Sequence, residues 1–234
     1  MNNCEMFYLK SPWTWKVLVK LLILVLVIVP IFVEYLLKEY LLAILQNDLY
    51  SGTLIGLIMS IIFMLGLYFI AIRPNNLSWK EVGLKRFPTN YWKAIIGWTS
   101  ILIVISIAMV VVIEILLSVG PDNSKTDSLQ SRMTFLNFLI GFVSAAIISP
   151  LYEEIFYRGF LYRFLRSKFG ITISMLSSSF IFMIVHIPTF NTLPINFVSG
   201  LIFAWTYEKS GSIVPAIIIH GIFNGIAVIL TVLG

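Results

Sequence analysis

The residues best suited to chemistry are two adjacent glutamates, Glu153 and Glu154, followed one helical turn later by Arg158. Apolar residues surround this group on both sides of the chain. Placing a charge inside a bilayer is expensive, so ionisable residues within membrane segments usually mark a functional site. The alternative is an ordinary charged cap at a helix end. It is disfavoured because apolar residues continue beyond Arg158.

The spacing gives the two carboxylates different surroundings. Residues four apart lie on one face of a helix, so Glu154 is expected to pair with Arg158. Glu153 is rotated by about 100° around the helix and faces another direction. The arginine then holds one carboxylate ionised, and the other is available to act as a general base.

Both histidines of the chain, His186 and His220, also lie in apolar segments. Each has a polar or aromatic neighbour four residues away, because Phe182 precedes His186 and Asn224 follows His220. Asn224 is predicted either to orient His220 or to donate a hydrogen bond to an oxyanion. A single membrane histidine more often makes a helix–helix hydrogen bond, since an unpaired polar group is costly there. Two histidines with these neighbours favour a site.

A helical hairpin at Gly170 places Glu153 and His186 at the same depth. Glu153 lies 17 residues before Gly170, and His186 lies 16 residues after it. At a rise of 1.5 Å per residue, both are roughly 25 Å from the turn. His220 is roughly 15 Å from a turn at Ser210, and it reaches the same level if the first hairpin projects roughly 10 Å further.

A glutamate, two histidines and an asparagine in one membrane cavity predict a water molecule activated to attack a carbonyl group. Two routes are open: Glu153 takes the proton of the water directly, or a divalent metal such as zinc is bound by Glu153, His186 and His220. The cofactor is therefore a divalent metal such as zinc, or none. The chain has no HExxH and no GxSxG sequence, which excludes a zincin and a nucleophile-elbow serine hydrolase.

Composition predicts an all-α, polytopic integral membrane protein. The 234 residues are 59% hydrophobic and only 12% charged, whereas soluble domains carry about 25% charged residues. Seven apolar segments are candidate spans, and an eighth arises if the first helix breaks at Pro30 and residues 34–45 form a separate half-helix. The seven are 17–35, 53–72, 94–119, 135–148 with its continuation through the glutamates, 171–187, the short 195–207, and 213–233.

Basic residues indicate how the chain is oriented. Lys10 and Lys16 precede the first span, and Arg163 and Arg166 follow the glutamates. The positive-inside rule then places the amino terminus and the post-glutamate loop in the cytoplasm of a multi-pass cell-membrane protein. The net charge of +5 is explained by such loops, so no nucleic-acid partner is expected. The single cysteine, Cys4, excludes an internal disulfide and a cysteine-based metal site.

Three motifs resemble those of the CPBP family of intramembrane proteases, the CAAX-protease and bacteriocin-processing enzymes also called the Abi family. Order, spacing and membrane context all match. The resemblance covers residues 135–234, the implied catalytic core, whereas the helices and interfacial segment of residues 1–134 match only in general character. The motifs are Glu153-Glu154-x-x-x-Arg158, Phe182-x-x-x-His186 and His220-x-x-x-Asn224.

The resemblance implies an all-helical membrane endopeptidase whose catalytic cavity opens towards the cytoplasm, with a glutamate-dependent or a metal-dependent mechanism. It implies that Glu153 and His186 activate the water and that His220 and Asn224 stabilise the oxyanion. Expected partners are membrane lipid and a peptide or protein substrate that enters from the membrane or the cytoplasm. Bacterial members process peptides or act in bacteriocin self-immunity. The residues implied to support the site are Glu154, Arg158 and Phe182.

Two other classes of function are compatible with these residues. A non-catalytic immunity or scaffold protein keeps the fold and binds a bacteriocin or a sensor kinase, and its protection survives the Glu153→Ala substitution. A proton-coupled transporter uses glutamate and histidine as a proton relay, and its uptake depends on a pH gradient. The lack of internal repeats and of paired broken helices disfavours the transporter.

Overall fold

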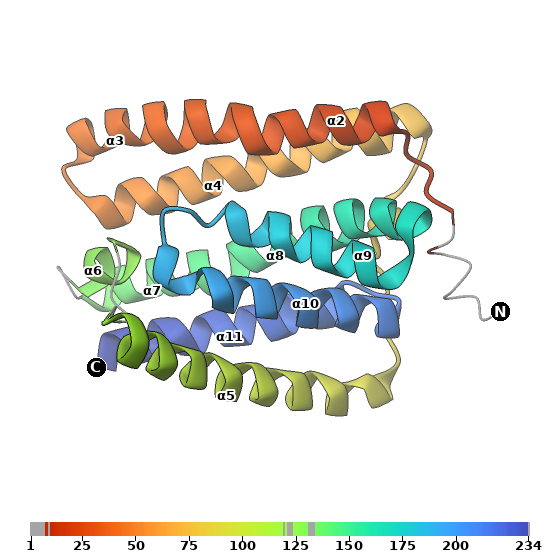
Figure 1. Cartoon of the computed structure of the whole chain (residues 1–234). Coiled ribbons are helices and arrows are strands. Elements are labelled where there is room, and N and C mark those ends of the chain that lie inside the picture. Colours follow the sequence, from red (N-terminus) through yellow and green to blue (C-terminus); the bar gives the residue numbers. More distant parts are fainter. Residues whose placement is uncertain (1–7, 9, 119, 121–123, 131–133, 234) are drawn as a thin grey trace.

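The computed structural model describes residues 8, 10–118, 120, 124–130 and 134–233, so Cys4 lies outside the described residues. Within these ranges the chain is almost entirely helical and has no β-strand. The long helices lie side by side and form a bundle (Figure 1). The predicted all-α class of a polytopic membrane protein is confirmed.

The first long helix continues through Pro30, so the separate half-helix considered for residues 34–45 does not form. Pro30 lies in a π-helical stretch, where hydrogen bonds run to the fifth residue instead of the fourth. The proline has no N–H to donate, and the π-helical stretch accommodates it without ending the helix. The segments of this helix are α2 (Trp15–Ile23), η1 (Leu24–Leu37) and α3 (Lys38–Leu45).

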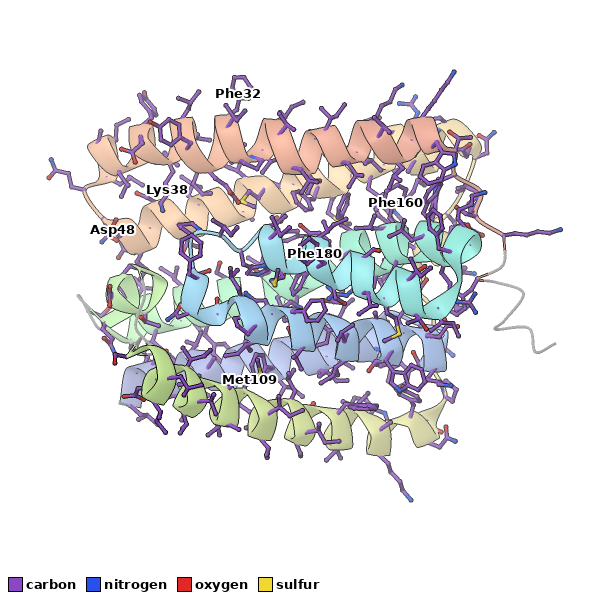
Figure 2. The ribbon with its side chains drawn as sticks, viewed as in Figure 1. Phe32, Lys38, Asp48, Met109, Phe160 and Phe180 are labelled. Atoms are coloured by element: carbon purple, nitrogen blue, oxygen red, sulfur yellow. The ribbon has the colours of Figure 1, made fainter. Side chains whose placement is uncertain are left out.

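The second long helix returns antiparallel to the first. Asn47 caps its first turn, because the Asn47 side chain accepts a hydrogen bond from the backbone N–H of Tyr50 at 3.0 Å. The outer faces of this hairpin are apolar, and Phe32 points away from the bundle (Figure 2). The second helix consists of α4 (Asp48–Leu67), η2 (Tyr68–Ile72) and η3 (Arg73–Asn75).

The glutamates lie in a long helical arm that reverses at Gly170. Gly170 has φ 77° and ψ −176°, a conformation that glycine adopts far more readily than other residues. The predicted hairpin at this position is therefore present. The arm comprises α7 (Phe135–Val143), η6 (Ser144–Ile148), α8 (Ser149–Glu154), η7 (Ile155–Tyr162) and α9 (Arg163–Ile184).

The remaining helices enclose this arm. Short 3-10 turns join the second helix to α5, and another precedes α10, which packs along α9. The connecting turns are η4 (Trp79–Val82), η5 (Thr89–Tyr91) and η8 (Phe190–Thr192). The helices are α5 (Trp92–Leu117), α6 (Ser124–Gln130), α10 (Leu193–Ser210) and α11 (Val214–Leu233).

Five helical stretches of the described chain are long and apolar enough to cross a membrane. The fourth contains both arms of the Gly170 hairpin and so covers two of the seven predicted spans. The predicted short span 195–207 lies in α10, which is not one of the five. The five are Trp15–Leu45, Asp48–Asn75, Thr89–Leu116, Phe135–Ile184 and Val214–Leu233.

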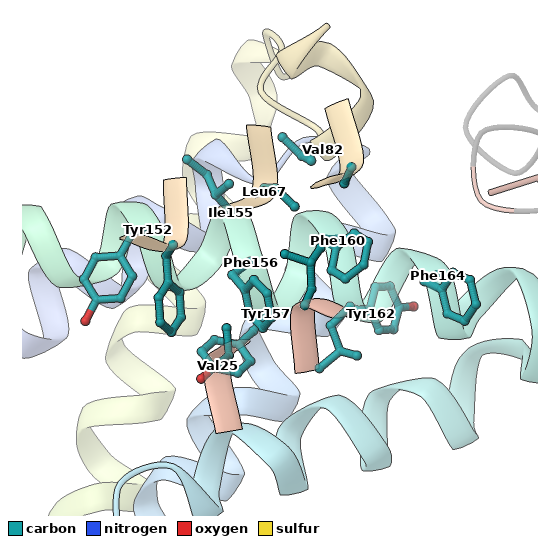
Figure 3. Close-up of a cluster of buried hydrophobic side chains, with 14 of the residues drawn as sticks. Val25, Leu67, Val82, Tyr152, Ile155, Phe156, Tyr157, Phe160, Tyr162 and Phe164 are labelled. Carbon is teal, nitrogen blue, oxygen red and sulfur yellow. The ribbon is translucent and has the colours of Figure 1, made fainter. Parts of the chain in front are cut away.

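Buried side chains from both halves of the chain form one core. Phe63 of α4 packs edge-on against Tyr152 and Phe156, and each pair of ring centroids is 5.2 Å apart. Val25 of η1 and Tyr157 of η7 belong to the same buried cluster (Figure 3). Packing thus crosses residue 134, and the amino-terminal helices form a wall beside the glutamate-bearing arm.

Candidate active site

The two glutamates lie where α8 passes into the π-helical segment η7. Glu153 and Glu154 are the last residues of α8, and η7 begins at Ile155. Such π-helical insertions are uncommon and often occur at functional sites. Gly159 allows η7 to approach the chain at Val82, because a Cβ at Gly159 would lie 2.5 Å from the Val82 carbonyl oxygen.

Glu154 and Arg158 form the predicted ion pair. Arg158 Nη1 donates to Glu154 Oε1 at 2.9 Å, and both side chains are fully buried. Arg158 Nη2 also donates to the Gly200 carbonyl of α10 at 3.3 Å. The guanidinium lies over the Phe182 ring, 4.2 Å from its centroid. Arg158 therefore joins η7 to α9 and α10 around one buried carboxylate.

His220 of α11 lies between the two glutamates. Its Nδ1 is 2.9 Å from Glu154 Oε1, and its Nε2 is 3.9 Å from Glu153 Oε2. A carboxylate bound to a guanidinium accepts hydrogen bonds. Nδ1 of His220 therefore carries the ring proton and donates a hydrogen bond to Glu154. Nε2 then faces Glu153. The imidazole is stacked on Phe203, with ring centroids 4.6 Å apart and 20° between the planes.

His186 lies just beyond the end of α9 and joins the site through Phe182. Its Nδ1 is 2.7 Å from the Phe182 carbonyl oxygen, and the two ring centroids are 4.7 Å apart. The Thr189 hydroxyl donates to the His186 carbonyl. The centroid of the Phe182 ring is also 5.9 Å from that of the His220 ring, so one aromatic ring contacts both imidazoles. The predicted pairing of Glu153 with His186 stays a prediction, while His220 Nε2 lies 3.9 Å from Glu153 Oε2.

Asn224 lies one turn after His220, and its amide is directed towards η6. Its Nδ2 donates to the Ala145 carbonyl oxygen at 3.0 Å. This bond uses one of the two amide hydrogens of Asn224. Gly221 allows the close approach, because a Cβ at that position would lie 2.5 Å from the Ala146 carbonyl oxygen. The position of α11, and with it of His220, thus depends on its contact with η6.

The three candidate metal ligands, Glu153, His186 and His220, do not fit a metal ion in this arrangement. Among the described residues, no three histidine, cysteine, aspartate or glutamate side chains are grouped so that they could hold one. A catalytic zinc site needs three protein ligands, each about 2.0–2.2 Å from the ion for nitrogen and oxygen donors. We therefore derive no step through a metal.

A cavity of about 350 Å³ lies between the start of α7 and the end of α11, away from the predicted site residues. It is lined by Thr134, Phe135, Phe138, Ile229, Val232 and Leu233. None of the residues singled out from the three motifs contributes to it. The catalytic cavity open to the cytoplasm therefore remains a prediction.

Some residues of the site carry no signal in the sequence. Phe203 stacks on His220, and Gly200 accepts from Arg158 through its backbone, yet both lie in an apolar helix without a motif. Tyr157, one turn after Glu153, is the residue that helical spacing could have singled out.

Residues 135–226 match the model of a family described as type II CAAX prenyl endopeptidase Rce1-like. This part of the chain is similar to that family. The match confirms the resemblance to the CPBP intramembrane proteases and supports an intramembrane CAAX-type endopeptidase. It spans all seven residues of the three motifs. No curated protein and no solved structure matches the chain.

Proposed function

We propose that the protein is an intramembrane endopeptidase in which Glu153 takes the proton from the attacking water. The observation that carries the proposal is the different surroundings of the two glutamates. Glu154 is fully buried and bound by Arg158 and His220. The Glu153 side chain retains 12% exposure and faces His220 Nε2. These surroundings support a structural role for Glu154 and a general-base role for Glu153.

The distances in the site suit a bound water molecule. A water making hydrogen bonds of about 2.8 Å to both Glu153 Oε2 and His220 Nε2 is compatible with their separation of 3.9 Å. In the proposed reaction the water oxygen attacks the peptide carbonyl carbon, and Glu153, assisted by His186, receives the proton. His220, when protonated on both nitrogens, and the second amide hydrogen of Asn224 donate to the oxyanion. The intermediate then expels the amine, which takes the proton from Glu153.

The proposed substrate is a peptide or protein tail that reaches the site from the membrane or the cytoplasm. We propose a role in bacterial peptide processing or bacteriocin self-immunity. The amino terminus and the Gly170 turn are proposed to face the cytoplasm. The position of the start of the first helix beside the Gly170 turn supports this, because the Trp15 ring centroid lies 4.9 Å from that of Phe164 and 6.1 Å from that of Phe169.

The test is peptide hydrolysis by the purified protein in bilayer nanodiscs. The probe is an internally quenched peptide that ends in a farnesylated CAAX tail. We expect Glu153→Gln to lower kcat by about 10²–10⁴-fold, the usual contribution of general acid–base catalysis. Glu39→Gln is the matched control, because Glu39 is an exposed glutamate outside the site. Wild-type cleavage by the Glu153 variant would overturn the proposal.

In cells, the same substitution separates proteolysis from a binding role. If the protein confers protection against a bacteriocin by proteolysis, Glu153→Gln abolishes the protection although the protein remains in the membrane. Protection that survives the substitution contradicts the catalytic role and favours a non-catalytic immunity protein. Membrane levels measured by immunoblot provide the control.

A further inference from the structure

Phe203 of α10 lies flat against the His220 imidazole. The two rings are stacked, with centroids 4.6 Å apart and 20° between their planes. Phe203 is fully buried, and it lies in a helix that carries none of the three motifs. Phe182 meets the same imidazole edge-on, at an angle of 88°. The parallel contact from Phe203 thus defines the plane of the imidazole.

A single hydrogen bond does not fix the orientation of this imidazole. Glu154 Oε1 lies 2.9 Å from His220 Nδ1, and that bond holds one corner of the ring but lets the ring tilt about it. A tilt moves Nε2, which lies 3.9 Å from Glu153 Oε2, a spacing that one hydrogen-bonded water can bridge. A flat apolar ring packed against the imidazole opposes the tilt. The stack with Phe203 therefore supplies a constraint that the carboxylate does not.

The packing of α10 on α9 fixes the position of Phe203. Gly200 precedes Phe203 by three residues, so the two lie on neighbouring parts of one helix face. A Cβ at Gly200 would lie 2.9 Å from Ser179 Cβ, so the two helices approach closely at this point. The Gly200 carbonyl accepts from Arg158 Nη2 at 3.3 Å, and the guanidinium lies 5.1 Å from the Phe203 ring centroid. The ion pair and the close contact thus hold α10 within one turn of the stack.

We propose that Phe203 is a positioning residue for peptide hydrolysis, because it holds the plane of the His220 ring so that Nε2 faces Glu153. It acts on the reaction through His220. The assignment rests on the proposed endopeptidase activity, and it adds α10 to the helices that set the geometry of the reaction. The competing role is that of a core side chain alone, since Phe203 also packs in a buried cluster with Ile219. A core role predicts a loss of stability without a specific loss of kcat.

Steady-state kinetics separate the two roles. Phe203→Leu keeps an apolar side chain but removes the flat ring, whereas Phe203→Tyr keeps the ring. Misplacing a group that acts in the transition state lowers kcat and leaves KM unchanged. The probe is the farnesylated CAAX peptide, with the proteins in nanodiscs. We expect Phe203→Leu to lower kcat by about 10–100-fold, and Phe203→Tyr to retain most of the wild-type rate.

Phe164→Leu is the matched control. Phe164 is also fully buried, but its ring packs edge-on against Trp15 near the Gly170 turn, outside the site. We expect both Phe→Leu variants to lower the melting temperature and only Phe203→Leu to lower kcat. Equal losses of kcat in the two variants, or a wild-type kcat in Phe203→Leu, would overturn the positioning role.

A spectroscopic measurement tests the stack independently of hydrolysis. The chain has two histidines, so histidine isotope-labelled at Cε1 gives two NMR signals, and His186→Gln assigns them. Protons over the face of an aromatic ring are shielded. We expect the Hε1 resonance of His220 to lie upfield of that of free histidine in wild type and Phe203→Tyr, and to move downfield in Phe203→Leu. The wild-type signal needs no variant to fold.

An unshifted His220 resonance in the wild-type protein contradicts the stack, as does the same resonance in wild type and Phe203→Leu. Failure of the catalytic proposal is separate, because it shows as cleavage by Glu153→Gln and leaves the NMR result unchanged.

Discussion

Removing the guanidinium of Arg158 is expected to destabilise the protein strongly. Arg158→Met keeps an unbranched side chain of similar length but leaves Glu154 in a fully buried position. The variant also loses the contact with the Phe182 ring and the hydrogen bond to the Gly200 carbonyl. Only His220 Nδ1 then remains as a partner of the Glu154 carboxylate among the described residues.

The size of the effect follows from the burial of the pair. Removing one partner of a buried ion pair typically costs about 3–5 kcal/mol, because the remaining charge is left without compensation. Replacing both partners by apolar side chains of similar volume is often neutral or stabilising. We therefore expect a loss of about 3–5 kcal/mol for Arg158→Met and recovery of most of that loss in the double variant Glu154→Leu/Arg158→Met.

Stability and activity are expected to separate in the double variant. Glu154 accepts the Nδ1–H of His220 and so fixes the imidazole. Without it, Nε2 is no longer held towards Glu153, and peptide hydrolysis stays low although the fold is restored. The free energy of unfolding in mixed detergent micelles and the hydrolysis rate of the farnesylated peptide measure the two effects.

The control is Arg166→Met. Arg166 lies in the same arm and pairs with Glu208 at 3.0 Å, but this pair retains some exposure and lies outside the site. We expect a smaller loss of stability than for Arg158→Met, because Glu208 keeps the Tyr162 hydroxyl as a hydrogen-bond donor, and we expect activity close to wild type. The reasoning is refuted if Arg158→Met costs less than this control, or if the double variant regains both stability and full activity.

Two further predictions concern the contact between α11 and η6. Gly221→Ala places a Cβ 2.5 Å from the Ala146 carbonyl oxygen, so we expect a loss of about 1–3 kcal/mol and at least tenfold slower hydrolysis. Gly97→Ala is the control: it has no atom within 4 Å of its new Cβ and is expected to be neutral or slightly stabilising. Equal melting temperatures of the two variants would contradict the close contact between Gly221 and Ala146. Asn224→Leu leaves the Ala145 carbonyl oxygen without its hydrogen-bond donor. We expect the free energy of unfolding to fall by about 1–3 kcal/mol in the same assay. An unchanged free energy of unfolding would show that water replaces the amide.

Local spacing predicted the parts of the site that lie on one helix. The Glu154–Arg158 pair follows from residues four apart, and the ring of Phe182 meets His186 for the same reason. The reversal at Gly170 also followed from local signals, because a glycine interrupts an apolar pattern. In each case the relevant contact is within a few residues of the motif, so helical periodicity is sufficient.

Contacts between helices were harder to predict because they depend on rotation and register. Depth counting placed Glu153 opposite His186, a pairing that stays a prediction. Depth contains no information on which face of α11 turns inwards, so it did not predict the approach of His220 Nε2 to within 3.9 Å of Glu153 Oε2. Pro30 indicated a break that does not occur, since local i→i+5 hydrogen bonding accommodates it. The bond from Asn224 to Ala145 depends on η6, whose π-helical turns have no sequence signature.

The arrangement of charges explains why the site tolerates lipid surroundings. Glu154, Arg158 and His220 satisfy one another and are held by α9, α10 and α11, so they behave as one structural unit. Glu153 lies beside that unit, with its Oε2 3.9 Å from His220 Nε2. Because buried residues of η1 and η7 belong to one cluster, a change in the packing of η1 is expected to alter the surroundings of Glu153 without disrupting the ion pair. Activity is therefore expected to respond to substitutions in the first span that leave the stability of the motif region unchanged.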